Sequence, residues 1–349
     1  MTGEYGGLTL RPYQALCAVC SLGEEDSGPK DEKLKDILDA VRKNPDMPIT
    51  LKCNVGDVFL FQDPGTEDDK PEGAEYNRRR DLEMLLLLNL VPGVTVTARI
   101  LFNRILDRIT TVLGICGYDT VTSDVWKGCP KAMSGCYEKA REKGTAAIIP
   151  PRSEEEMERE KKESLEAMYK ARKTGITIRP HILLCAVCQY GGGVRPPFKP
   201  DNLPELIQLI LKEPDTLITL AEGADWMMCA PCPNCVPRLN ACVNVNGSGG
   251  LTNQLRDLRT LQKLSLTYGT TMNARELYKL IFEKIPSTLD ICRLDSPNPS
   301  VWWDGCGART TNNENYEKGR EMLKHVSENS PSSPLIKGDK GGRGLYISG

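Results

Sequence analysis

The sequence contains only two histidines, and this scarcity excludes several kinds of metal site. They are His181 and His325. A catalytic zinc site with three histidine ligands cannot be assembled within one such chain, and the HExxH pattern of zinc proteases is absent. A metal site rich in protein ligands must therefore be dominated by thiolates, which favour iron–sulfur clusters or structural zinc.

Strong net charge and long apolar runs are also missing. The formal net charge of the 349 residues is -2, which gives no electrostatic reason to expect a nucleic acid or an anionic membrane as partner. No apolar run approaches the roughly 20 residues that a membrane span needs. The first residues have neither the basic nor the apolar segment of a secretory signal peptide. We therefore expect a soluble, cytoplasmic protein that binds neither nucleic acid nor membrane.

Cysteine, in contrast, is abundant, with 14 residues in the chain. In a reducing cytoplasm structural disulfides are disfavoured, so clustered cysteines there more often bind metal or carry out redox chemistry. A single C-x-x-C pair is weak evidence, because in thioredoxin-like proteins it forms a redox dithiol at a helix N-terminus. Cys17 and Cys185 each follow an apolar run and no recognisable strand-to-helix turn, which favours metal binding over a dithiol role.

Two parts of the sequence repeat each other. The segment Arg-Pro-x-x-x-Leu-Cys-Ala-Val-Cys occurs at residues 11–20 and, with Leu184 before its first cysteine, again at residues 179–188. Further matches, among them Arg80-Asp81 with Arg256-Asp257, follow at slowly increasing offsets, as expected for a tandem duplication with small insertions. The matched cysteines are Cys17 with Cys185, Cys20 with Cys188, Cys116 with Cys292, and Cys129 with Cys306.

The duplication predicts an α+β, helix-dominated fold made of two tandem copies of one cysteine-bearing module. The first copy covers residues 8–145 and is predicted to be degenerate, and the second covers residues 175–325. Residues 150–174 carry many charges of both signs, with Ser153 as a plausible helix start, and are expected to form a solvated linker helix. Residues 327–349 are rich in serine, proline and glycine and are expected to be disordered.

Within the second copy, apolar periodicity predicts helices over residues 204–212, 255–266 and 273–285, and a short strand over residues 216–220. Asn273 is expected to cap the last of these helices, and Asp225 is expected to cap the cysteine-rich stretch or hydrogen-bond its amides. The cysteine-rich stretch between the strand and the helices contains prolines and glycines, and we expect it to be a loop.

The most specific pattern is Cys229-x2-Cys232-x2-Cys235, followed seven residues later by Cys242. C-x2-C-x2-C is the spacing of the first three ligands in a bacterial ferredoxin run. Short loops let three sulfurs converge on one centre, and the prolines limit the entropy lost when the segment is ordered. The C-x3-C-P ending of a ferredoxin is missing, so a ferredoxin fold is not expected. Candidates for the fourth ligand are Cys242, Cys185, Cys292 and Cys306.

The matched cysteines leave two arrangements open. In one, the four shared cysteines form a site in each copy and the second copy has an additional site. In the other, a single site in the second copy mixes both sets, and the first copy is a structural duplicate. We favour the second arrangement, because Phe59 and Phe61 replace the cysteine run in the first copy and are expected in an apolar core. The predicted ligands are Cys185, Cys229, Cys232, Cys235 and Cys242, with Cys188, Cys292 and Cys306 as further candidates.

The second copy resembles a family of small bacterial and archaeal proteins known as the DUF1284 family. The resemblance covers about residues 178–306 and rests on Arg179-Pro180-His181 before Cys185, Asp225, Cys229-x2-Cys232-Pro233, Cys242, Arg256-Asp257, Ile291-Cys292, Trp302 and Cys306. That family is regarded as iron–sulfur binding and has no assigned reaction. The resemblance therefore implies a metal centre that includes Cys229 and Cys232, without implying a chemistry for it.

Three classes of function remain compatible with the sequence. We favour an iron–sulfur protein for electron transfer or redox sensing, with an unidentified redox or protein partner. The alternatives are a zinc-stabilised, noncatalytic scaffold or interaction module, and an enzyme of unrecognised reaction. The sequence shows no nucleophile–base pair, nucleotide-binding loop or cofactor fingerprint that would support the enzyme.

Overall fold

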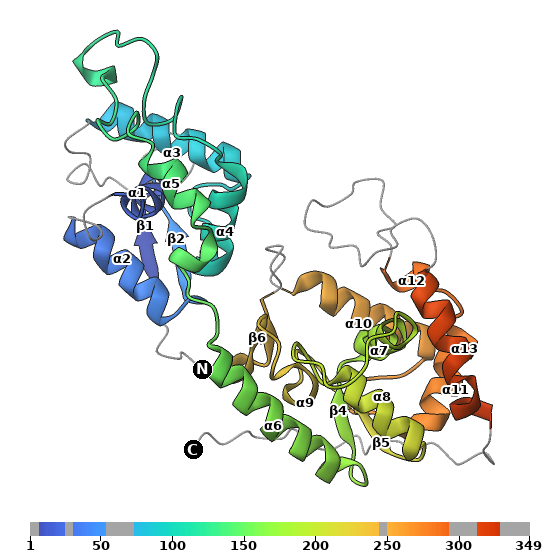
Figure 1. Cartoon of the computed structure of the whole chain (residues 1–349). Helices are drawn as coiled ribbons and strands as arrows, with labels where there is room; N and C mark the ends of the chain where they lie inside the picture. Colours follow the sequence, from blue (N-terminus) through green and yellow to red (C-terminus); the bar gives the residue numbers. More distant parts are fainter. Residues whose placement is uncertain (1–6, 25–30, 54–72, 244–249, 293–312, 329–349) are drawn as a thin grey trace. The chain divides into compact units, whose positions relative to one another are not determined.

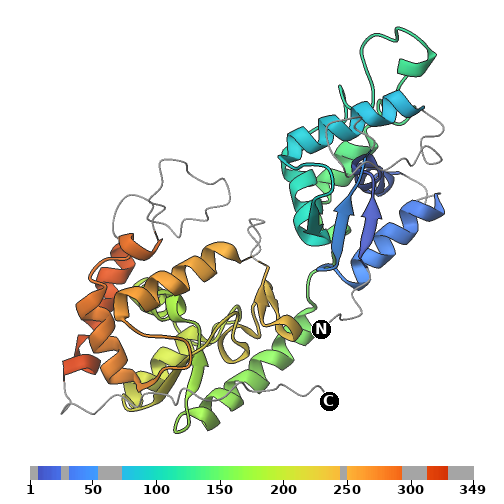
Figure 2. The ribbon, with the colours of Figure 1, turned by 180° about the vertical axis from the view of Figure 1, so that it is seen from behind.

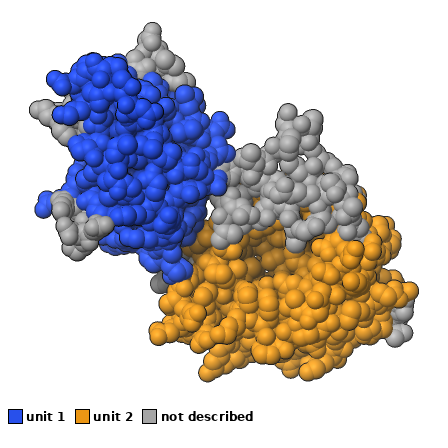
Figure 3. All heavy atoms as spheres, turned by 45° about the horizontal axis from the view of Figure 1, so that its top comes forward, with its two compact units in different colours: residues 1–151 blue, residues 152–349 orange. Residues whose placement is uncertain are grey.

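The chain forms two compact units, which Figure 3 colours separately. Unit 1 spans residues 1–151 and unit 2 spans residues 152–349, and each has its own hydrophobic core. Helices dominate both units and the sheets are small and mixed, so the predicted helix-dominated α+β class is confirmed (Figure 1). The computed structural model describes residues 7–24, 31–53, 73–243, 250–292 and 313–328.

A three-stranded sheet forms the centre of unit 1 (Figure 2). β1 (Leu8–Leu10) is parallel to β2 (Pro48–Leu51), and β3 (Thr95–Thr97) adds to β2 in the antiparallel direction. The connection between the two parallel strands contains α1 (Pro12–Ser21) and α2 (Glu32–Lys43). A crossover of this kind is required, because a tight hairpin can join only antiparallel strands.

Three further α-helices lie in the described part of unit 1, namely α3 (Ala74–Leu88), α4 (Ala98–Arg108) and α5 (Cys136–Glu142). α1 packs against α2, α3 and α5. Its central position follows from its sequence, because apolar and small residues occupy almost every turn and leave no charged face. Two short 3-10 turns, η2 (Asp124–Trp126) and η3 (Thr145–Ala147), lie before and after α5.

Unit 2 contains a second three-stranded sheet. β4 (Ile176–Ile178) is parallel to β5 (Leu217–Leu220), and β8 (Thr271–Asn273) is antiparallel to β5. The crossover between β4 and β5 contains α7 (Pro180–Gly191) and α8 (Leu203–Lys212). The order of elements around this sheet is therefore the same as around the sheet of unit 1.

From residue 250 onward, the described part of unit 2 contains four helices: α10 (Leu251–Leu264), α11 (Ala274–Lys284), α12 (Leu289–Cys292) and α13 (Glu314–Glu328). α13 packs along α7 and also against α11 (Figure 1). Gly319 permits this close approach, since a Cβ there would lie 2.1 Å from the carbonyl oxygen of Val187.

The segment between β5 and α10, predicted to be a loop, contains regular structure. α9 (Trp226–Cys229) is followed by a two-stranded hairpin of β6 (Cys235–Val236) and β7 (Ala241–Cys242). The turn of the hairpin contains η4 (Pro237–Leu239) and closes through Asn240, whose φ of 49° lies in the left-handed region that asparagine tolerates. The loop prediction is therefore wrong here, because proline and asparagine shape the turns of a small ordered motif.

The predicted charged helix forms as α6 (Glu154–Ala171). The Ser153 hydroxyl caps it by accepting a hydrogen bond from the N–H of Glu156 at 3.1 Å. α6 packs against α9 and β4, and the side chains of Ser164 and Met168 are fully buried. One face of the helix therefore belongs to the core of unit 2, while its remaining faces carry the charges.

Most element predictions for the second copy are confirmed, with shifted bounds. The predicted helices 204–212 and 273–285 form as α8 and α11, and the predicted strand 216–220 forms as β5. The helix predicted over residues 255–266 forms as α10, which begins earlier. Asn273 caps α11 as predicted, with its side-chain oxygen 2.8 Å from the N–H of Glu276.

Both units contain the same local contacts. A pair of threonine hydroxyls links the second and third strands, at 2.8 Å between Thr50 and Thr95 and at 2.8 Å between Thr219 and Thr271. An arginine at the start of the following helix pairs with an aspartate in both units: Arg99 with Asp46 at 2.9 Å and Arg275 with Asp215 at 3.2 Å.

Each Cys-Ala-Val-Cys segment lies in a helix that directly follows the first strand of its sheet. A strand-to-helix turn therefore precedes both segments, and the sequence interpretation missed it. Cys17 and Cys20 nevertheless lie beyond the first turn of α1, and Cys185 and Cys188 lie beyond the first turn of α7. None of these thiols has the N-terminal position that activates a redox dithiol.

Three predictions concern residues outside the described part of the chain. They are the core positions of Phe59 and Phe61, the ligand role of Cys306, and the disordered tail, of which only residues 327 and 328 are described, at the end of α13. Within the described residues, no helix is both long and apolar enough to cross a bilayer.

Candidate metal centre

Two successive turns connect the three cysteines of the C-x2-C-x2-C run. The N–H of Cys232 donates to the carbonyl of Cys229 at 2.8 Å, and the N–H of Cys235 donates to the carbonyl of Cys232 at 3.0 Å. Both hydrogen bonds span three residues, as in β-turns. The C-x2-C-x2-C spacing therefore corresponds to two consecutive turns of the backbone.

The hairpin adds a fourth cysteine to this run. Cys235 in β6 is the direct cross-strand partner of Cys242 in β7. Side chains of directly opposed residues lie on the same face, with Cβ atoms about 4.5–5.5 Å apart. Cys242, one of the predicted fourth ligands, is therefore next to Cys235.

Side chains from other elements hold the backbone of the run in place. The Arg152 guanidinium donates to the carbonyls of Ala230 at 2.6 Å and Cys232 at 2.9 Å. The Asn202 amide donates to the carbonyl of Met227 at 2.6 Å. These contacts fix the positions of Cys229 and Cys232 without using their sulfur atoms.

Asp225 is the N-cap of α9. Its carboxylate accepts a hydrogen bond from the N–H of Met228 at 3.3 Å and another from the hydroxyl of Thr177 in β4. The predicted capping role of Asp225 is confirmed. Burial raises the pKa of this carboxyl to about 6, and the two hydrogen bonds oppose that rise. Asp225 therefore links the start of the cysteine run to the sheet.

The thiols of the run are neutral in the protein without metal. Burial raises the pKa of Cys229, with Cys235 and Cys232 as further causes, and burial likewise raises the pKa of Cys235 to about 12. The guanidinium of Arg179 opposes the rise at Cys229, and that of Arg152 opposes it at Cys235. A bound metal would have to displace protons from these thiols, and the two arginines would favour the resulting anionic centre.

A polar network that the sequence interpretation missed extends to Cys242. The Asn253 amide nitrogen lies 3.6 Å from the sulfur of Cys242, and its amide oxygen accepts from Arg256 at 3.1 Å. The sequence contains one signal for this network, because an Arg-Asp pair occurs in both units, as Arg80-Asp81 and as Arg256-Asp257. In each unit an asparagine, Asn77 or Asn253, lies three residues before the arginine.

His181 contacts a buried carboxylate. Its N–H and its Nδ1 lie 3.0 Å and 2.6 Å from Asp257, which also pairs with Arg179 at 2.6 Å. Burial lowers the pKa of His181, and the hydrogen bond to Asp257 opposes this change. Asp257 thereby holds the start of α7 and orients the histidine.

The remaining predicted ligands lie in the helical part of unit 2. Cys185 and Cys188 are on α7 and Cys292 ends α12, and all three are half-buried against the core. Cys188 and Cys292 are both electrostatic neighbours of the buried phenol of Tyr316. Among the described residues, no group of three or more histidine, cysteine, aspartate or glutamate side chains is already arranged to hold a metal ion. The ligand set therefore stays a prediction.

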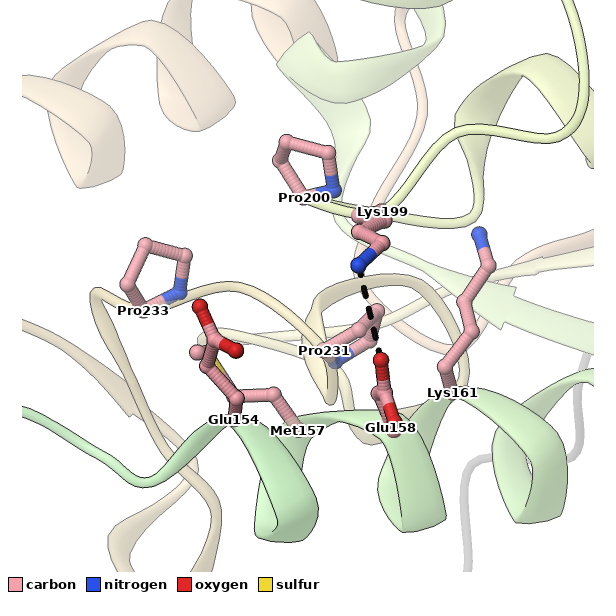
Figure 4. A pocket seen from close by; sticks show the side chains of 8 residues that line it. All are labelled: Glu154, Met157, Glu158, Lys161, Lys199, Pro200, Pro231 and Pro233. Carbon is pink, nitrogen blue, oxygen red and sulfur yellow. Dashed lines mark hydrogen bonds and ion pairs between the residues drawn. The ribbon is translucent and has the colours of Figure 1, made fainter.

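A pocket of about 220 Å³ borders the cysteine run (Figure 4). Pro231 and Pro233, on either side of Cys232, form part of its lining, and Lys199 pairs with Glu158 across it at 3.4 Å. A group that enters this pocket would contact Pro231 and Pro233, the two neighbours of Cys232 in the chain. The other lining residues are Glu154, Met157, Lys161 and Pro200.

Comparisons with known proteins give no assignment. No family model, no curated protein and no solved structure matches the chain. The functional argument therefore rests on the residues and contacts of this chain.

Proposed function

We propose that the chain binds a thiolate-ligated iron–sulfur centre in unit 2 and uses it for electron transfer or redox sensing. The observation that carries this proposal is the pairing of Cys235 with Cys242, directly after the turns that connect Cys229 to Cys235. One short segment thus presents four cysteines, and the sequence spacing of the first three is that of a ferredoxin run.

The charges around the segment support an anionic centre. Arg152 donates to the carbonyl of Cys232 at 2.9 Å, and the Arg179 guanidinium lowers the pKa of Cys229 against the effect of burial. The pKa of Cys229 is raised by burial, and Arg179 only opposes that rise. Iron–sulfur clusters held by four thiolates carry net negative charge, and nearby cations stabilise it and shift the reduction potential.

A zinc-stabilised scaffold is the second candidate. It is favoured by the way the run joins separate parts of unit 2: Arg152 comes from the residues before α6, Asn202 from those before α8, and Asp225 contacts β4. A closed four-cysteine zinc site would tie these elements together and stabilise the fold directly.

The test is metal analysis of full-length variants. We expect Cys232→Ser to abolish metal binding at this site, because a zinc or cluster site loses affinity when a thiolate is replaced by a hydroxyl. Cys53→Ser and Cys136→Ser serve as matched controls and should keep the metal, since neither cysteine has a partner in the other copy. Unchanged metal content in the Cys232 variant would refute the proposed site.

We also infer that units 1 and 2 are diverged copies of one module. The identical strand order, the paired threonine hydroxyls and the repeated Arg–Asp pairs support this relationship. On this interpretation the α9–hairpin segment is what distinguishes the second copy.

A further inference from the structure

Unit 1 brings two pairs of cysteines together. Cys17 and Cys20 lie three residues apart on α1, so their side chains share one face of the helix. Cys116 and Cys129 are joined through the backbone, where the N–H of Cys129 donates to the carbonyl of Cys116 at 2.7 Å. The buried hydroxyl of Tyr76 bridges the same two groups, donating to the carbonyl of Cys116 at 2.5 Å and accepting from the N–H of Cys129 at 3.0 Å.

Cys20 lies close to the second pair. The thiols of Cys116 and Cys129, together with those of Cys17 and Cys136, are electrostatic neighbours of Cys20. α1 also approaches the start of α5 very closely, since a Cβ on Gly23 would lie 1.8 Å from the carbonyl oxygen of Cys136. The thiols thus gather between α1, α5 and the segment between α4 and α5.

A buried cation lies beside this group. Nη1 of Arg80 is 3.9 Å from the sulfur of Cys17 and 4.0 Å from the sulfur of Cys116, so these two sulfurs are no farther apart than the sum of the two distances. The Arg80 guanidinium also lies over the rings of Tyr13 and Tyr76, at 4.2 Å and 4.7 Å from their centroids. A guanidinium in contact with sulfur stabilises the thiolate relative to the thiol.

We propose that unit 1 holds a thiolate-ligated metal centre of its own, with Cys17, Cys20, Cys116 and Cys129 as ligands and Arg80 as a neighbouring cation. The four ligands are the cysteines that both copies share, and the centre does not depend on the cysteine run of unit 2. The upper limit on the distance between the Cys17 and Cys116 sulfurs accommodates the roughly 6–7 Å that separates cysteine ligands around a cubane cluster.

The proposal departs from the arrangement that the sequence interpretation favoured, in which the first copy is only a structural duplicate. In unit 2 the phenol of Tyr316 is a neighbour of Cys188 and Cys292, as the phenol of Tyr137 is of Cys20 and Cys116 in unit 1. Since no described group of side chains is already arranged to hold an ion, loading requires the cysteine side chains to change rotamer.

The first experiment compares metal content in full-length variants after anaerobic reconstitution with iron and sulfide and, separately, with zinc. We expect the double variant Cys20→Ser/Cys129→Ser to lose one centre per chain and to keep the centre that Cys232→Ser/Cys235→Ser removes. Cys53→Ser, a buried control in the same unit, should keep both. Wild-type metal content in a folded Cys20/Cys129 variant would overturn the proposal.

A second measurement uses the wild-type chain, so that it does not depend on a variant folding. Pulsed alkylation with peptide mass spectrometry should show that metal loading protects Cys17, Cys20, Cys116 and Cys129 about tenfold or more relative to the reduced protein without metal. Equal alkylation of these four cysteines with and without metal would overturn the proposal. Protection confined to Cys229–Cys242 would overturn the proposed centre of unit 1 and leave the proposed function of unit 2 intact. Protection confined to the four cysteines of unit 1 would support the centre of unit 1 and refute the one in unit 2.

Discussion

The two units bury the same ion pair in different surroundings. In unit 1, Arg11 pairs with Asp81 at 2.7 Å, and in unit 2, Arg179 pairs with Asp257 at 2.6 Å. Burial raises the pKa of Asp81 to about 6 despite the arginine. At Asp257 burial also acts upward, but the interactions with His181 and Arg179 outweigh it and lower the pKa.

The residue that differs is the second one after the arginine, which is tyrosine in unit 1 and histidine in unit 2. The N–H of Tyr13 donates to Asp81 at 2.9 Å, whereas His181 contacts Asp257 through both its N–H and its ring. The phenol of Tyr13 instead lies under the guanidinium of Arg80, on the side of the cysteines. One substitution thus changes both how the carboxylate titrates and what the neighbouring arginine contacts.

Removing the carboxylates should have the largest effect. We expect Asp257→Asn to lower the free energy of unfolding by about 3–5 kcal/mol, because it leaves the buried Arg179 without its carboxylate charge. Asp81→Asn should cost less, because burial already disfavours the charged form of Asp81. Urea denaturation of the variants measures both, and a larger loss for Asp81→Asn than for Asp257→Asn would contradict the comparison.

Exchanging tyrosine and histidine at positions 13 and 181 should exchange the pH dependence of stability between the two units. The folded-state pKa of His181 lies below its ordinary value, so the unfolded chain binds the extra proton first and stability is lost as the pH falls below about 6.5. We expect His181→Tyr to reduce the loss of stability of unit 2 between pH 7 and pH 5, and Tyr13→His to introduce such a loss in unit 1.

Hydrogen exchange of the amides in α7 and α1 measures the stability of each unit separately. The contribution of Asp81 to the pH dependence of stability has the opposite sign to that of His181. Because its pKa is raised, protonation below about pH 6 favours the folded state, so unit 1 gains stability from this group on acidification. A pH response of α7 that is unchanged by His181→Tyr would show that another group controls it.

Removing the helix caps of the two units should give the smallest difference in stability. Asn273 caps α11 with a 2.8 Å hydrogen bond, while Thr97 caps α4 at the equivalent place with a 3.4 Å hydrogen bond. Replacement by alanine should cost about 1 kcal/mol at Asn273 and less at Thr97. Thermal denaturation can rank the two variants, and a larger loss for Thr97→Ala would mean that these hydrogen-bond lengths do not set the cap energies.

The sequence predicted those parts of the fold that depend on neighbouring residues. The caps Ser153, Asn273 and Asp225 were recognisable because an N-cap acts within three residues of itself. The position of Cys242 opposite Cys235 was not, since it depends on the left-handed turn at Asn240 and on strand register.

Long-range contacts were even less accessible. Arg152 was grouped with a charged linker, yet it donates to the carbonyl of Cys232, 80 positions away. Arg80 appeared as half of an Arg-Asp pair, and only the packing of α3 against α1 places it next to two thiols. Charge patterns in a sequence do not identify the partner of a charge when that partner is a backbone carbonyl or a sulfur atom.

The most direct test of the central claim is the metal content of the full-length protein purified without oxygen. We predict iron with acid-labile sulfide and broad visible absorption that is bleached by reduction, as for a thiolate-ligated iron–sulfur centre. Stoichiometric zinc in a colourless protein from iron-replete cells would support the scaffold instead. A chain that contains neither metal, and takes up neither on reconstitution, would contradict the account.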